Sequence, residues 1–193
     1  MTTPALVLAS ASPRRSELLQ RVGLTFEVRP ADIDERPLEG EAPAAMVERV
    51  SLAKARAVGL SLQGPHLILA ADTIVVRDGT ILGKPATAEE AITTVTSLAG
   101  RAHEVITGYA LLREDGRHVA GHCTTTVRFR PLTPGTIARY VATGEPMDKA
   151  GAYGIQGIGA MLVQSIEGSY TNVVGLPLVE VLERLPELGG PAL

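Results

Sequence analysis

The stretch HLILAADTIVV, residues 66–76, decides the fold. Its aliphatic and β-branched residues are too apolar for a surface element and predict a central β-strand that is buried on both faces. Asp72 is its only residue charged at neutral pH, and a lone carboxylate there costs several kcal/mol unless it is paired. Candidate partners are Lys54, Lys84, a metal ion or a helix-capping contact. Asp72 is the best single candidate for catalysis, with a structural ion pair as the alternative.

Helical and extended patterns alternate on both sides of this stretch. Strands are expected at residues 5–9, 25–29, 102–113, 117–130 and 160–166. Helices are expected from Ser12 to Gly23 and at residues 43–59, 87–100, 133–143 and 176–188. This order predicts the fold class α/β, a mixed sheet with flanking helices that forms two lobes around a central cleft.

Length and composition narrow the class of protein. The 193 residues fit a single domain, 1–193, divided into lobes. The net charge of −3 and an aromatic share of 3 % disfavour a nucleic-acid partner. The single cysteine, Cys123, fits a reducing compartment, and no apolar run approaches the ~18 residues that cross a bilayer. We therefore expect a cytoplasmic protein without a membrane or nucleic-acid partner.

The first expected helix begins in a way that suits a bound phosphate. Ser12 can cap it and Pro13 suits its first position, but Arg14 and Arg15 then place cations where the helix dipole disfavours them. An anion at the same place would be stabilised by the free N–H groups. Arg15 also shares a face with apolar residues and should point inward. A solvated arginine pair, or an ion pair with a neighbouring helix, is the alternative.

Lysine is scarce, with three residues against fifteen arginines, so each lysine is a candidate for a role that needs a compact ammonium. Lys54 lies on the apolar stripe of the helix at 43–59 and must either extend to solvent or face a negative partner. Lys84 lies between Gly83 and Pro85, which present it rigidly. A plain turn explains that glycine and proline but not the lysine.

Two loops add further candidate groups. The acidic run within residues 30–41 should be mostly solvated, and spacing does not show which carboxylate faces the cleft. The glycine-rich run that follows Lys149 surrounds Gln156, whose amide suits a nucleobase edge because it both donates and accepts. Cations, carboxylates and one such amide together suit a nucleoside triphosphate with Mg²⁺.

Several motifs carry a resemblance to a known family. They are LASASPRRSELL, AADTIVV, LGKP, LAGRAHEVITG, DKAGAYGIQG and IEGSYTNVVGLPL. In this order they resemble the Maf family of nucleoside triphosphate pyrophosphatases, and the similarity extends from residue 5 to about 182. The resemblance implies hydrolysis between the α and β phosphates in a cleft between two lobes, a house-cleaning role on surplus or non-standard nucleotides, an association with septum formation, and a homodimer.

The resemblance also assigns roles to residues. The implied catalytic residues are Asp72, Lys84, Lys54 and Glu35. The implied substrate-binding residues are Ser12, Arg14, Arg15, Thr73 and Gln156. Glu35 and Asp72 are expected to hold a divalent cation, Mg²⁺ or Mn²⁺. Arg14, Thr73 and Gln156 match members that act on dTTP and UTP. A pyrophosphatase for another base, such as 7-methyl-GTP, and a nucleotide sensor of cell division without turnover are the alternatives.

Overall fold

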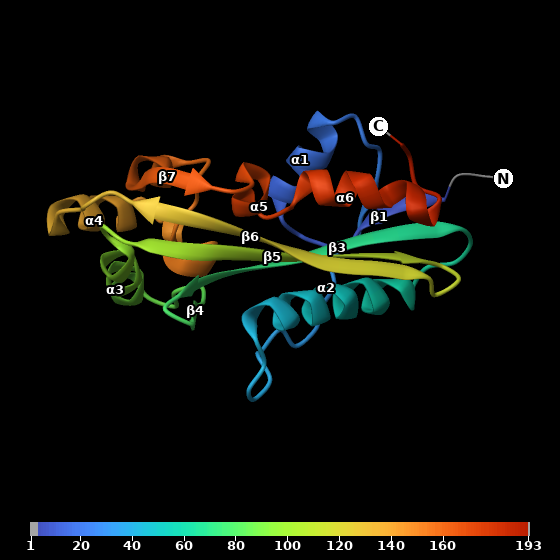
Figure 1. The fold of residues 1–193 in the computed structure, drawn as a ribbon, viewed down its shortest axis with the longest axis horizontal. Coiled ribbons are helices and arrows are strands. Elements are labelled where there is room, and N and C mark those ends of the chain that lie inside the picture. Colours follow the sequence, from blue (N-terminus) through green and yellow to red (C-terminus); the bar gives the residue numbers. More distant parts are fainter. Residues whose placement is uncertain (1–3, 193) are drawn as a thin grey trace. The chain divides into compact units, whose positions relative to one another are not determined.

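The computed structural model describes residues 4–192, which divide into two compact units. The first unit comprises the described residues of Met1–Asp72, Thr107–Cys123 and Gly175–Leu193, and the second comprises Thr73–Ile106 and Thr124–Val174. The strands β3, β5 and β6, labelled in Figure 1, each contribute residues to both units. The expected two lobes therefore correspond to two units that the chain enters more than once.

The strands form one mixed sheet in the order β2-β1-β3-β5-β6-β7, with β4 paired to β3. The strands are β1 (Ala5–Leu8), β2 (Glu27–Val28), β3 (His66–Arg77), β4 (Thr80–Leu82), β5 (Ala102–Arg113), β6 (His118–Phe129) and β7 (Val163–Glu167). β1 runs parallel to β2 and β3, whereas β4 is antiparallel to β3 and β7 is antiparallel to β6. The expected α/β class with a mixed sheet is confirmed.

Helices occupy most of the segments where the sequence predicts them. Within residues 4–192 the α-helices are α1 (Pro13–Arg21), α2 (Pro43–Gly59), α3 (Ala88–Leu98), α4 (Pro134–Val141), α5 (Tyr170–Val174) and α6 (Leu178–Arg184). In the first unit, α2 lies on one face of the strands, and α1 and α6 lie on the other (Figure 1). β3 is buried along nearly its whole length, as predicted.

Most boundaries lie within about two residues of the prediction, and three segments differ in extent or in kind. β2 has two residues rather than 25–29, because only Glu27 and Val28 find partners on β1. The strand expected at 160–166 begins at Val163, since Ile158–Leu162 forms a 3-10 helix, η3. The closing helix at 176–188 is split into α6 and a 3-10 turn, η4 (Leu185–Leu188), which has a proline in its first turn. The short helix α5 was not predicted.

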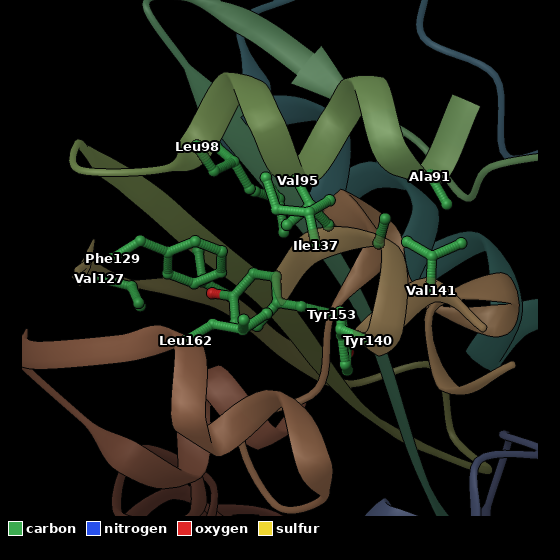
Figure 2. Close-up of a cluster of buried hydrophobic side chains, with 13 residues drawn as sticks. Ala91, Val95, Leu98, Val127, Phe129, Ile137, Tyr140, Val141, Tyr153 and Leu162 are labelled. Carbon is green, nitrogen blue, oxygen red and sulfur yellow. The ribbon is translucent and has the colours of Figure 1, made fainter. Parts of the chain in front are cut away.

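A cluster of buried side chains forms the core of the second unit, with α3 and α4 packed on β5 and β6 (Figure 2). His103 lies in this core beside Tyr153 and Phe129 and is only 3 % exposed. Its Nε2 shares a hydrogen bond of 2.8 Å with the Tyr153 hydroxyl. Burial lowers the pKa of His103 to about 4, so the ring is neutral in the folded protein at neutral pH.

His103 makes stability depend on pH in a defined window. Because its folded pKa of about 4 lies below the ordinary 6.5, the neutral ring favours the folded state above pH 6.5, and this contribution is lost as the pH falls towards 4. The loss amounts to about 3 kcal/mol in the free energy of unfolding. Urea denaturation between pH 7 and 4.5 measures it. In His103→Gln the free energy of unfolding should no longer fall with pH in this window. In the control His118→Gln, which changes an exposed histidine, it should still fall. Equal pH dependence in both variants would contradict the assignment.

Candidate active site

Three of the predicted site residues meet in the first unit. Lys54, on α2, donates to Asp72 Oδ1 on β3 at 2.7 Å, and its Nζ lies 2.8 Å from Glu35 Oε1 in the loop before α2. The side chains of Lys54 and Asp72 are each only 10 % exposed, whereas Glu35 is 48 % exposed. The lysine on the apolar stripe therefore faces negative partners. The alternative in which it extends to solvent is wrong, and Lys54 is the partner that Asp72 required.

The two carboxylates also fit a divalent cation. Asp72 and Glu35 both contact the Lys54 ammonium, so two carboxylates face the same cationic group. Within residues 4–192 no three His, Cys, Asp or Glu side chains gather into a metal-binding group. Mg²⁺ nevertheless needs only one or two protein carboxylates when substrate phosphates and water complete its shell. The donor set present is therefore suitable for a metal that arrives with a nucleotide.

Arg15 points inward from α1, as its position on the helix predicts. It is 9 % exposed, and its guanidinium donates to the Gly175 carbonyl at 2.7 Å and to Ser10 Oγ at 2.9 Å. Burial lowers the pKa of Arg15 and the nearby Asp72 charge opposes that shift, yet an arginine remains protonated throughout the ordinary pH range. A buried, oriented guanidinium is thus part of the first unit.

The start of α1 is built partly as predicted. Ser12 is the N-cap residue and Pro13 follows at the first position, with Arg14 half-buried in the first turn. In the described structure the Ser12 side chain makes no capping hydrogen bond, which corrects its predicted capping role. Its backbone N–H instead donates to Ser10 Oγ at 3.2 Å. Ser10 was not singled out from the sequence, and its contacts orient both this turn and the Arg15 side chain.

The loop that carries Glu35 is held by arginines on either side. Arg49, on α2, donates to Glu41 at 2.7 Å and to the Arg36 carbonyl at 3.1 Å. Asp34 accepts from the Arg36 side chain at 2.6 Å. The hydrogen bonds from these arginines lower the pKa of Asp34 and of Glu41 to about 2. Asp34 is exposed, as expected for most acids of this loop, whereas Glu41 is largely buried against Arg49 and links the loop to α2.

The remaining predicted residues belong to the second unit. Thr73 follows Asp72 directly on β3 and is half-buried. Lys84 is exposed in the turn after β4, where the Gly83 carbonyl accepts from Gly151 N at 3.1 Å. Gln156 is half-buried between two 3-10 helices. Each unit therefore carries part of the predicted set.

The fold and the first unit's cluster define a class of protein: a mixed α/β protein with a lysine–carboxylate group and a buried arginine, side chains of the kind that bind phosphorylated ligands. A family model described as "Maf-like protein" matches residues 5–188, and the chain belongs to this family. The family resemblance inferred from the sequence motifs is thereby confirmed.

Curated relatives match along nearly the whole chain. A protein of Syntrophotalea carbinolica named "dTTP/UTP pyrophosphatase" is 56 % identical over 187 residues, which covers 95 % of this chain and 84 % of that protein. Proteins with the same name from Symbiobacterium thermophilum and Moorella thermoacetica are 53 % and 55 % identical, and each alignment covers 95 % of that relative. Among the helices of residues 4–192, none combines the length and the apolar character needed to span a membrane.

Proposed function

We propose that this protein is a nucleoside triphosphate pyrophosphatase that hydrolyses dTTP and UTP to the nucleoside monophosphate and pyrophosphate. The carrying observation is the group in which the buried Lys54 contacts the buried Asp72 at 2.7 Å and the exposed Glu35 at 2.8 Å, in a chain whose relatives bear the name "dTTP/UTP pyrophosphatase". A buried carboxylate with a specific charge partner is a candidate functional group, and Mg²⁺ bound to a nucleotide takes one or two protein carboxylates.

Each residue has a part in the proposed reaction. A water oxygen adds to one of the two bridged phosphorus atoms, its proton passes to Asp72, and the α–β bridge breaks to release pyrophosphate. Asp72 and Glu35 would hold a Mg²⁺ or Mn²⁺ ion, which when bound offsets phosphate charge. Lys54 keeps the two carboxylates together. Arg14, Arg15 and Lys84 stabilise charge that develops on the phosphates, and Ser12, at the start of α1, also binds the substrate.

The domain organisation, the oligomeric state and the cellular location are also proposed. The whole chain, residues 1–193, would work as one catalytic domain, because the family match includes segments of both units. A homodimer is the proposed assembly, since two-fold dimers are the commonest closed oligomers. The single cysteine, Cys123, supports a reducing, cytoplasmic setting.

A nucleotide panel tests the proposed activity. The protein is incubated with dTTP, UTP, CTP and 7-methyl-GTP in the presence of Mg²⁺ or Mn²⁺, and pyrophosphate and orthophosphate are assayed separately. We expect pyrophosphate from dTTP and UTP. Orthophosphate alone would indicate cleavage at the γ phosphate, preference for 7-methyl-GTP would overturn the base assignment, and tight binding without product would favour the nucleotide sensor.

The base preference is proposed to depend on Gln156, with Thr73 and Arg14. Uracil and thymine present an acceptor, donor, acceptor edge, to which a primary amide can both donate and accept a hydrogen bond. Gln156→Glu removes the donor and leaves one polar contact unsatisfied, worth about 1 to 3 kcal/mol. We expect kcat/KM for UTP and dTTP to fall by about 10-fold or more, with a smaller loss for CTP. An equal decline for all three nucleotides would show that Gln156 does not read the base.

A further inference from the structure

The loop Gly154–Gly159, which carries Gln156 near its middle, is closed at both ends. At one end Gly154 N donates to the Tyr140 hydroxyl at 3.3 Å, and at the other end Gly159 N donates to Glu145 Oε1 at 2.9 Å. The two ends also touch each other, because a Cβ added at Gly159 would lie 2.5 Å from the Gly154 carbonyl oxygen. All these residues belong to the second unit.

The Glu145 carboxylate is the centre of this closure. Its Oε2 accepts from Ile158 N at 2.7 Å, and its Oε1 accepts from Gly159 N and, at 3.1 Å, from the Tyr140 hydroxyl. The Tyr140 hydroxyl thus accepts from one end of the loop and donates to the carboxylate that holds the other end. A carboxylate can accept on both oxygens, whereas an amide side chain offers one oxygen only. Both oxygens of Glu145 are in use.

Tyr140 gives this arrangement a rigid base. Its side chain is fully buried in the core of the second unit, close to Tyr153 (Figure 2). Burial, and then the charge of Glu145, raise the pKa of Tyr140, so its hydroxyl stays protonated and remains a donor. One of the side chains that close the loop, Tyr140, is therefore anchored in a packed core, and it holds the half-buried Glu145 through a hydrogen bond.

The glycines of the loop are required by these close contacts. A Cβ at Gly157 would overlap the Glu145 carboxylate, and a Cβ at Gly154 would lie 2.8 Å from Cε of Lys149. Lys149 itself donates to the Glu145 carbonyl at 2.7 Å. The loop backbone at Gly154 and Gly157 thus packs against the side chains of Lys149 and Glu145. This packing restricts the positions that Gln156 can take.

From this geometry we infer that Glu145 is a positioning residue for base selectivity. Acting through the loop and with Tyr140, it holds the Gln156 amide in the orientation that reads a uracil or thymine edge, and it does not itself touch the substrate. The inference rests on the proposed function, because it needs Gln156 to be the group that reads the base. Positioning errors at a site of this kind weaken recognition without removing any contact group.

Steady-state kinetics of Glu145→Gln with UTP, dTTP and CTP test the inference. We expect KM for UTP and dTTP to rise about 10-fold with kcat changed less than about two-fold, and the ratio of kcat/KM for UTP over CTP to fall about 10-fold. Tyr140→Phe removes one hydroxyl from the same arrangement and should shift this ratio in the same direction. The exposed Glu89→Gln, at the start of α3, is the matched control and should leave the ratio unchanged.

A double-mutant cycle separates positioning from general loop stability. If Glu145 acts through Gln156, adding Glu145→Gln to Gln156→Ala should change the UTP to CTP ratio less than about two-fold. Equal losses for all nucleotides, or a further loss of selectivity in the Gln156→Ala background, would overturn the inference while leaving the pyrophosphatase intact. Absence of pyrophosphate from every nucleotide with the wild-type protein would instead overturn the proposed function, and the inference with it. If Glu145→Gln does not fold, Tyr140→Phe decides by the same ratio.

Discussion

Replacing Asp72 by asparagine is expected to lower kcat for pyrophosphate release from UTP by about 100-fold or more. The amide has nearly the shape of the carboxylate, but it neither accepts a proton from water nor carries the charge that a divalent cation prefers. The Lys54 contact of 2.7 Å can survive, since the asparagine oxygen still accepts from the ammonium. The fold should therefore remain, and the loss should lie in turnover.

The measurement is pyrophosphate release under saturating nucleotide and Mg²⁺, with circular dichroism to confirm that the variant folds. Asp115→Asn is the matched control, because Asp115 is an exposed carboxylate of the first unit at the turn between β5 and β6. The kcat of Asp115→Asn should equal that of the wild type. If Asp72→Asn retains more than about a tenth of the activity, Asp72 is not the proton acceptor.

Replacing Lys54 by methionine is expected to reduce both stability and turnover. Its ammonium is buried between Asp72 and Glu35, and removing one partner of a buried ion pair leaves an uncompensated charge, at a cost of about 3 kcal/mol in the free energy of unfolding. The carboxylates also lose the group that holds them together, so kcat should fall by about 100-fold. Urea denaturation and pyrophosphate release measure the two effects.

Arg56→Met provides the control for Lys54→Met, because Arg56 is an exposed cation on the same helix. The double variant Lys54→Met with Asp72→Asn should be more stable than the sum of the two single losses by about 1 to 3 kcal/mol, since it removes both charges. Strictly additive losses would show that the two side chains do not stabilise each other.

Elements with strong local signals could be predicted closely from the sequence. α2 begins at Pro43 and ends at Gly59 as expected, because a proline suits the first helical turn and an apolar stripe defines the buried face. Elements whose extent depends on pairing with a neighbouring strand could not be predicted closely. β7 begins only where it can pair with β6, and the residues before it turn into η3 instead. No local pattern contains that information.

The candidate site likewise combines residues that the sequence identifies with residues that it does not. Asp72 and Lys54 are recognisable because each places a charge on an apolar surface, and they prove to be each other's partners. Glu35 could not be separated by spacing from the other acids of its loop, since what distinguishes it is a contact with Lys54, nineteen residues further along the chain. The role of Ser10 depends on an arginine five residues away, and that of Glu145 on backbone groups thirteen and fourteen residues away, so neither left a sequence signal.

The hydrogen bond from Arg15 to the Gly175 carbonyl links positions 160 residues apart. During synthesis the arginine leaves the ribosome early, but the carbonyl that orients it is made only when the segment leading into α6 appears. A nascent chain that stops before Gly175 has the arginine but lacks its acceptor. The arginine proposed to bind phosphate thus acquires its orienting contact late in translation, and an unfinished chain lacks that part of the proposed nucleotide site.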